Sequence, residues 1–267
     1  MNEAKDELVE YYGKYNEEKR LLSPHGQIEY RTTMHYIETL MAGIPCPKVA
    51  DIGAATGRYA IPLAEKGWEV TAVELVNYNL GILKQKAERA GISKEHLTAM
   101  QGDALNLSKL PADSFDLVLL LGPLYHLFTA DEKVQVLQEA RRIVKPQGRI
   151  IAGYIMNEFA VIRFGLQEGQ LLSSVETGNL DADFHVRNTP KDLFSYERIE
   201  DIDAYRERAG LKRLKLISQD GPTNYLRPVI DSLSEEAYET YFQYHLKTCE
   251  RAELIGAGCH TIDILYK

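Results

Sequence analysis

The amino-acid sequence predicts an α/β protein built on a mostly parallel β-sheet. Five short apolar runs lie between residues 48 and 155, and stretches with helical features separate them. Apolarity within each run is continuous rather than alternating, which is typical of parallel strands buried on both faces. Strands that alternate with helices indicate βαβ units, so we expect right-handed crossovers within one sheet. The runs are VADIG, WEVTAVEL, HLTAMQGD, FDLVLLLG and GRIIAGYI.

Helices are predicted before and between these strands. Residues 1–47 contain helical patterns, including a stretch over residues 27–41, and glycine and proline then break the chain before the first strand. Within the predicted core, residues 48–155, one helix is well marked because Thr129 and Glu132 form a capping-box pattern.

The remainder of the chain is predicted to carry two insertions. In residues 156–198 the alternation of predicted strands and helices stops, and this segment is interpreted as a cap. Residues 199–267 begin with a helix near 199–209 and contain two strand-like runs, with a helical insertion over residues 221–254 between them. Tyrosines at three-residue spacing in that insertion favour an amphipathic core stripe over an aromatic cage for a cation. They are Tyr238, Tyr241 and Tyr244.

Composition excludes several classes of protein. The chain has 267 residues and a formal net charge of −8. An acidic surface repels phosphate backbones, so we expect no nucleic-acid partner. The first fifteen residues are charged and lack a signal-peptide core, and no apolar run approaches a membrane-spanning length, so we expect no membrane partner.

The cysteines and histidines predict neither disulfides nor a metal site. Three widely spaced cysteines without a CxxC pair favour free thiols in a reducing cytoplasm. Single histidines in the cap and tail lack metal-ligand spacing, so we assign them no role. These residues are Cys46, Cys249, Cys259, His185, His245 and His260.

A glycine loop joins the first strand to the helix that follows it. Gly53 and Gly57 bracket the turn, where a missing Cβ allows backbone N–H groups to approach a ligand. A ligand-free tight turn and the loop of a dinucleotide-binding fold have similar sequences. A Walker-type phosphate loop is excluded, because no Gly-Lys-Ser/Thr follows at the required spacing.

Acidic residues at three successive strand ends indicate the ligand. Asp51 precedes the glycine loop, where a carboxylate suits an ammonium group better than a pyrophosphate. Glu74 ends the second strand, where a carboxylate accepts from ribose hydroxyls. Asp103 ends the third strand, where a carboxylate accepts from the adenine amino group. Together they describe an adenosine with a positively charged amino-acid tail, which is S-adenosylmethionine.

This combination resembles the class I S-adenosylmethionine-dependent methyltransferases. DIGAATG is similar to the family's first motif, GDAL to its adenine-side motif and FDLVLLLGPLYHL to its fourth motif, and RRIVKPQGRII resembles the helix and strand that follow. The resemblance covers roughly residues 48–155 and is closest in style to bacterial small-molecule methyltransferases. The family usually has glycine where this chain has Ala55, and we expect Ala55 to keep a negative φ.

The resemblance implies a Rossmann-like sheet of seven strands, the last antiparallel, with N-terminal helices as a lid and helical cap insertions. Residues 1–47 would form that lid. Either Tyr11, Tyr12 and Tyr15 simply form an apolar helix face, or one of them, or Arg31, reaches the pocket. S-adenosyl-L-methionine would lie across the carboxyl ends of the central strands. The cofactor-binding residues implied are Asp51, Gly53, Ala54, Gly57, Glu74, Leu75, Asp103, Ala104, Leu105 and Leu121.

The segment after the fourth strand, where the family places acceptor-facing residues, reads Gly-Pro-Leu-Tyr-His. It lacks the Asn/Asp-Pro-Pro-Tyr motif used on base amines, so we expect a small-molecule methyl acceptor. His126 is interpreted either as a general base, since its unperturbed pKa is about 6.5, or as a structural cap of the short helix. Tyr125 is expected to line the cofactor or acceptor pocket, since a phenol with a pKa of about 10 is a poor base.

Two alternatives remain beside a methyltransferase. An NAD(P)-dependent oxidoreductase shares the loop and Glu74, but its second and third glycines are normally three residues apart, whereas Gly57 follows Gly53 by four. A non-catalytic cofactor-binding or scaffolding subunit is distinguished by binding without turnover.

Overall fold

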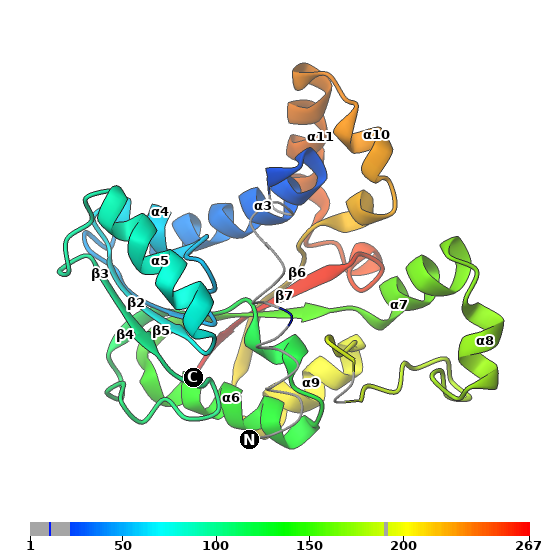
Figure 1. Ribbon diagram of the computed structural model, residues 1–267, viewed down its shortest axis with the longest axis horizontal. Helices are drawn as coiled ribbons and strands as arrows, with labels where there is room; N and C mark the ends of the chain where they lie inside the picture. The colour runs from blue at the N-terminus through cyan, green and yellow to red at the C-terminus, as the bar shows by residue number, and fades with distance from the viewer. Residues whose placement is uncertain (1–10, 12–21, 190–191) are drawn as a thin grey trace.

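A computed structural model describes residue 11 and residues 22–189 and 192–267. Seven strands form one sheet in the order β3-β2-β1-β4-β5-β7-β6 (Figure 1). Neighbouring strands are parallel except at β7, which runs antiparallel to both β5 and β6. The predicted fold class, including the reversed last strand, is therefore confirmed. The strands are β1 Lys48–Ile52, β2 Glu69–Glu74, β3 Leu97–Gln101, β4 Phe115–Leu120, β5 Val144–Ile155, β6 Lys212–Ser218 and β7 His260–Tyr266.

Helices cover both faces of this sheet and give two apolar cores. On one face, α3, α4 and α5 pack against alternate side chains of the strands, such as Val49 and Leu117. On the other face, α6 and α9 pack against the intervening side chains, such as Ala50 and Val118. The continuous apolarity of the strands follows from this double burial. The helices are α3 Pro24–Met41, α4 Ala60–Glu65, α5 Asn77–Arg89, α6 Ala130–Ile143 and α9 Ile199–Arg208.

The helix boundaries agree with the sequence signals where these were explicit. The stretch predicted over residues 27–41 is α3, and the helix predicted near 199–209 is α9. At the start of α6, Thr129 and Glu132 form both bonds of the predicted capping box. Of the N-terminal tyrosines, Tyr12 and Tyr15 lie outside the described residues.

Two helical insertions extend from the sheet as separate arms (Figure 1). The first arm follows β5 and the second lies between β6 and β7. No helix among the described residues combines the length and apolarity that crossing a membrane requires. The first arm holds α7 Asn157–Ala160, the π-helix η2 Val161–Gln167 and α8 Leu171–Glu176; the second holds η3 Gly221–Asn224, α10 Arg227–Asp231, α11 Glu235–Thr248 and η4 Ala252–Leu254.

The predicted tyrosine core stripe on α11 is wrong. Tyr244 is 57% exposed, and the buried side chains of this helix are Phe242 and His245. Residues three apart step backwards by about 60° around a helix of 3.6 residues per turn, so three such tyrosines cannot stay on one narrow face. Arg31 of α3 lies 3.9 Å from the Phe242 ring centroid and pairs with Glu239, so it faces α11.

A buried ion pair attaches the first arm to α6. The Nζ atom of Lys133 lies 2.9 Å from Glu197 Oε1, and both side chains are 2% exposed. Lys133 also donates to the carbonyl oxygens of Leu124 and Leu127 and to Ser195 Oγ, so its three protons are engaged. Burial lowers the pKa of the ammonium group, and the Glu197 carboxylate opposes that change. This network holds the turn after β4 against the C-terminal end of the first arm.

Replacing Lys133 by Met should lower the free energy of unfolding by about 3–5 kcal/mol, because it leaves the Glu197 carboxylate buried without its cation. The Lys133→Met, Glu197→Leu double variant should recover part of that loss. Urea denaturation followed by circular dichroism measures both changes. The matched control is Arg208→Met, which breaks an ion pair with Asp131 whose side chains are 49% and 87% exposed. A surface pair contributes about 1 kcal/mol or less, so an equal loss in both single variants would contradict the role given to Lys133.

Candidate cofactor and acceptor site

The sheet order brings the predicted strand-end residues onto one edge. β3, β2, β1 and β4 are consecutive neighbours and parallel, so their carboxyl ends lie side by side. Asp51, Glu74, Asp103 and Leu121 are thereby placed at or just beyond four adjacent strand ends. The geometry is that of a ligand site at the carboxyl edge of an open α/β sheet.

The backbone N–H groups of the glycine loop are directed into the protein. Gly53 and Ala54 donate to the Val73 carbonyl, at 2.8 and 3.1 Å, and Gly57 donates to the Ala54 carbonyl at 2.8 Å. The expected approach of these N–H groups to a ligand is therefore wrong for these residues. Gly53 instead permits a close contact within the chain, because a Cβ at its position would lie 2.8 Å from Pro123 Cδ. Ala54 and Gly57 are buried and shape the loop from beneath.

The carboxylate of Glu74 holds the loop in place. Its Oε2 accepts from the Ala55 N–H at 2.8 Å, and its Oε1 accepts from the Val76 N–H at 2.8 Å. Ala55 has φ of +46°, so the expectation of a negative φ is wrong. The left-handed conformation turns its N–H toward Glu74, which explains why the family prefers glycine there. Leu75, one of the predicted cofactor-binding residues, is partly buried beside Glu74.

Because a non-glycine residue in the left-handed region costs roughly 1 kcal/mol, Ala55→Gly should relieve strain in the loop. Glycine also loses more backbone entropy on folding, by roughly 0.5–1 kcal/mol, so we expect the free energy of unfolding to change by less than about 1 kcal/mol. Ala55→Val should lower it clearly, since a β-branched residue is worse at positive φ. Thermal unfolding of the two variants measures the difference, and an Ala55→Val protein as stable as Ala55→Gly would contradict the φ seen here.

Asp51 lies behind the loop rather than on its surface. Its carboxylate is buried, it accepts from the Ala60 N–H at the start of α4, and its Oδ2 has no hydrogen-bond partner among the described residues. Burial and the neighbouring Glu74 carboxylate raise the pKa of Asp51 to about 7. Burial likewise raises the pKa of Glu74, against three backbone N–H donors and Asn79. The site therefore contains two carboxylates that a nearby positive charge would stabilise in their ionised forms.

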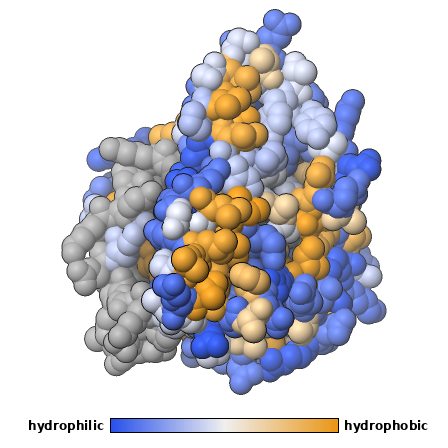
Figure 2. Space-filling model, turned by 90° about the vertical axis from the view of Figure 1, so that its right-hand side faces the viewer, coloured by the Kyte–Doolittle hydropathy of each residue, from blue (hydrophilic) through white to orange (hydrophobic). Residues whose placement is uncertain are grey.

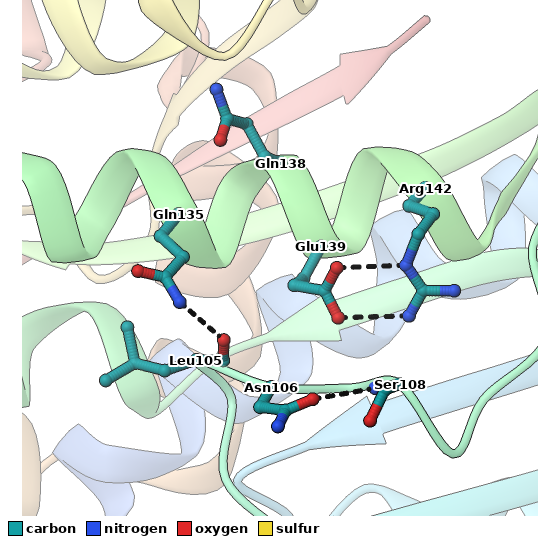
Figure 3. Close-up of a pocket in the computed structure, with 7 residues that line it drawn as sticks. All are labelled: Leu105, Asn106, Ser108, Gln135, Gln138, Glu139 and Arg142. Carbon is teal, nitrogen blue, oxygen red and sulfur yellow. Dashed lines mark hydrogen bonds and ion pairs between the residues drawn. The ribbon is translucent and has the colours of Figure 1, made fainter.

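The segment after β3 is anchored by α6. Asp103 Oδ1 accepts from the Leu105 N–H at 3.0 Å, which turns the chain sharply there. Gln135 of α6 donates to the Leu105 carbonyl at 2.8 Å, beside a polar pocket in which the Glu139 and Arg142 side chains form an ion pair (Figure 3). Asp103, Ala104 and Leu105 stay partly exposed, as an adenine contact requires. The pocket of Figure 3 is lined by Leu105, Asn106, Ser108, Gln135, Gln138, Glu139 and Arg142.

Tyr125 and His126 lie on the short 3-10 helix η1, Pro123–His126. The Tyr125 hydroxyl donates to the Leu121 carbonyl at 2.8 Å. His126 Nδ1 lies 2.9 Å from the Leu193 carbonyl, so Nδ1 carries the proton in the neutral ring. Burial lowers the pKa of His126 to about 4, and Lys133 contributes to the decrease. A pKa this low makes the imidazole a weak base, which together with the Leu193 contact favours the structural interpretation of His126 over the general base.

The first arm supplies functional contacts that the sequence did not predict. The Phe194 ring centroid lies 5.3 Å from that of His126, 6.0 Å from that of Tyr125 and 6.4 Å from that of Tyr11. Ser195 donates its N–H to the Tyr125 carbonyl. Phe194 is 68 positions after His126 in the chain, and no local signal marks this contact. Tyr11 thus lies against Phe194 of the first arm.

The seven-stranded sheet with its reversed β7 is the fold that the sequence resemblance implied, that of the class I S-adenosylmethionine-dependent methyltransferases. Residues 50–152 match a family described as a methyltransferase domain. The CcbJ methyltransferase from Streptomyces caelestis has a similar structure, with a TM-score of 0.61, 16% identity, and coverage of 100% of this chain and 99% of that one.

Two curated relatives match the same part of the chain. The ubiquinone biosynthesis O-methyltransferase of Haemophilus ducreyi is 29% identical over 115 residues, which is 43% of this chain and 48% of the relative. The S-adenosyl-L-methionine-dependent Diels-Alderase iccD of Talaromyces variabilis is 27% identical over 115 residues, which is 42% of this chain and 38% of the relative. The chain thus spans less than half the length of these relatives.

Proposed function

We propose that the protein binds S-adenosyl-L-methionine and transfers its methyl group to a small molecule. The observation that carries the proposal is the pair of buried carboxylates, Asp51 and Glu74, behind a loop in which the N–H groups of Gly53, Ala54, Ala55 and Gly57 are used within the protein. A phosphate needs free N–H donors, whereas a cationic amino-acid tail is attracted by carboxylates. The site therefore suits S-adenosylmethionine better than a nicotinamide dinucleotide.

The residues take the following roles in this proposal. Asp51 provides a negative charge near the ammonium group, Glu74 accepts from the ribose hydroxyls while holding the loop, and Asp103 with Ala104 and Leu105 contacts the adenine. Gly53, Ala54 and Gly57 shape the loop, and Leu75 and Leu121 contribute apolar contacts.

Tyr125 and His126 border the acceptor side in this proposal. They follow β4, where the methyl group of a cofactor placed across the strand ends would emerge. Methyl transfer is an in-line displacement on a carbon already activated by the sulfonium, so alignment and exclusion of water supply most of the catalysis. A neutral His126 held by Leu193 and Phe194 contributes by positioning.

A second candidate is a cofactor-dependent cyclisation without methyl transfer. It is supported by the similarity to a protein named as an S-adenosyl-L-methionine-dependent Diels-Alderase. A small-molecule methyl acceptor is supported instead by the similarity to a ubiquinone biosynthesis O-methyltransferase. The net charge of −8 disfavours a nucleic-acid acceptor, and the free thiols Cys46, Cys249 and Cys259 agree with a cytoplasmic location.

Titration calorimetry should detect binding of S-adenosylmethionine and S-adenosylhomocysteine, and Glu74→Gln should weaken both. Losing one charge-assisted acceptor costs about 1.5–3 kcal/mol, or roughly 10- to 150-fold in affinity. Glu69→Gln, at the other end of the same strand, is the matched control and should bind normally. Tight binding of NAD or NADP in place of S-adenosylmethionine would overturn the proposal.

The methyl-labelled cofactor then separates the two candidate functions. Label that appears in a low-mass metabolite fraction supports methyl transfer, whereas unlabelled, rearranged product formed only with cofactor supports cyclisation. Label in RNA, DNA or protein at a comparable rate would contradict a small-molecule acceptor.

The affinity for S-adenosylmethionine should depend on pH through Asp51. Its folded-state pKa of about 7 means that the carboxyl is protonated at lower pH, and the cationic ligand requires it ionised. Affinity should therefore fall as pH decreases from 7 to 5.5, by up to about tenfold per unit, and level off above pH 7. Calorimetry at pH 6 in buffers of different ionisation enthalpy should record proton release. Asp51→Asn should bind more weakly with a flat profile; an unchanged slope would assign the proton to another group.

A further inference from the structure

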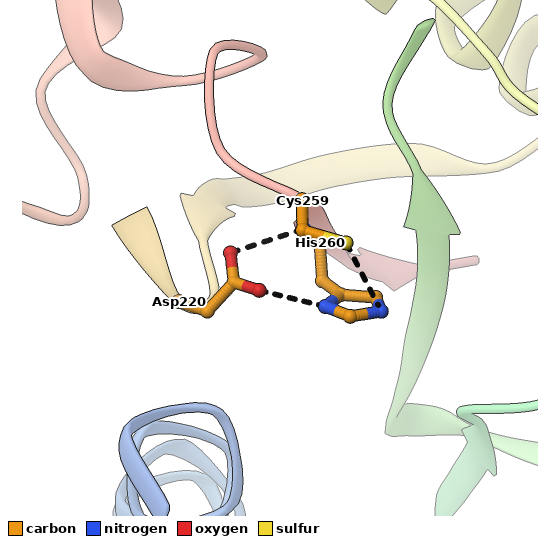
Figure 4. A group of neighbouring side chains, drawn as sticks. All are labelled: Asp220, Cys259 and His260. Carbon is orange, nitrogen blue, oxygen red and sulfur yellow. Dashed lines mark hydrogen bonds and ion pairs between the residues drawn. The ribbon is translucent and has the colours of Figure 1, made fainter. Parts of the chain in front are cut away.

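Two loops meet at the carboxyl edge of the sheet on the side away from β1. β7 runs antiparallel, so its first residue, His260, pairs with Ile155 at the carboxyl end of β5. β6 ends at Ser218 on the same edge, and Asp220 follows it. Asp220, Cys259 and His260 thereby converge from two loops (Figure 4).

The three side chains are close and largely buried. One ligand-type atom of each lies within 4.8 Å of the other two. Cys259 Sγ is 3.7 Å from His260 Nε2, and Asp220 Oδ2 is 2.7 Å from His260 Nδ1. Asp220 is fully buried, and the His260 side chain is 12% exposed.

A fourth group approaches from α3. The Oε2 atom of Glu29 lies 3.4 Å from His260 Nδ1, and the Glu29 side chain is also buried. Two carboxylates therefore face one ring nitrogen, which carries at most one proton. Burying two carboxylates is unfavourable unless positive charge compensates them, so the cluster has the electrostatic character of a cation site.

The backbone is built for this convergence. Asp220 Oδ1 accepts from the His260 N–H at 3.0 Å, and Asn224 donates to Asp220 Oδ2 at 2.7 Å. A Cβ on Gly258 would lie 2.8 Å from the Gly221 carbonyl oxygen, so glycine is needed where the two loops touch.

We infer that Asp220, Cys259 and His260 form a binding site for a zinc-class divalent ion. Thiolate, imidazole and carboxylate are the ligands of Zn²⁺ and Co²⁺, whereas Mg²⁺ and Ca²⁺ prefer oxygen alone. Ligands on one tetrahedral zinc are about 3.3–3.8 Å apart, given bonds of about 2.0–2.3 Å. The separation of Cys259 Sγ and His260 Nε2, 3.7 Å, already matches.

The second carboxylate completes the arrangement. With the ion on Nε2, the Nδ1 proton is donated to a carboxylate, the usual partner of a metal-bound histidine. Glu29 accepts this hydrogen bond. Asp220 Oδ2 turns toward the ion, while Asp220 Oδ1 still accepts from the His260 N–H. The ion then links α3 to the loops that precede β7 and follow β6.

Chelator-stripped full-length protein should bind one equivalent of Zn²⁺ in competition with a chromophoric chelator, and its melting temperature should rise. Co²⁺ should give a thiolate-to-cobalt charge-transfer band in the near ultraviolet. Cys259→Ser retains the Asp220 and His260 contacts, and it should abolish the band and weaken Zn²⁺ at least tenfold. Glu29→Gln, which alters the proposed partner of Nδ1 without removing a metal ligand, should weaken Zn²⁺ about 10- to 100-fold and keep the band.

Cys249→Ser is the matched control, because Cys249 is also buried but contacts Tyr36 instead. It should retain both the stoichiometry and the band. Binding well below one equivalent, a band that survives in Cys259→Ser, or equal loss in Cys249→Ser would overturn the inference. In that case the cluster is an ion pair of protonated His260 with Asp220 and Glu29.

Discussion

The carboxylate of Glu74 is the constraint on which the rest of the site depends. It binds the N–H of Ala55 across the loop and the N–H of Val76 in its own segment, so it joins the ends of β1 and β2. The left-handed Ala55, the inward N–H groups of Gly53 and Ala54, and the contact of Gly53 with Pro123 all belong to one loop conformation. Because the loop touches Pro123, that conformation also determines where η1 lies.

Most of the fold was predictable because burial acts on local sequence. The central strands β1 and β4 are buried on both faces, and that requirement makes their residues continuously apolar, as in FDLVLLL. The capping box of α6 is likewise a local pattern. The prediction of a tyrosine core stripe on α11 was wrong because aromatic side chains can lie half-exposed. The helix buries Phe242 and His245 instead.

The site was predictable where its residues stand at strand ends. Asp51, Glu74 and Asp103 could be placed together from the βαβ order alone. The φ of Ala55 could not be predicted, since it depends on a hydrogen bond to Glu74, which is 19 positions away. The contact of His126 with Leu193 spans 67 positions and that of Asp220 with His260 spans 40, and no periodicity encodes such pairs.

The inward N–H groups of the glycine loop have a consequence for molecular discrimination inside a cell. ATP and the nicotinamide dinucleotides share the adenosine moiety with S-adenosylmethionine. The N–H groups of Gly53, Ala54, Ala55 and Gly57 are already bonded within the protein, so they offer those phosphates no compensation for lost hydration, and the two buried carboxylates repel the phosphate charge when they are ionised. If the protein binds S-adenosylmethionine as proposed, rejection of the competing nucleotides would follow from the conformation of the loop backbone, before any acceptor arrives.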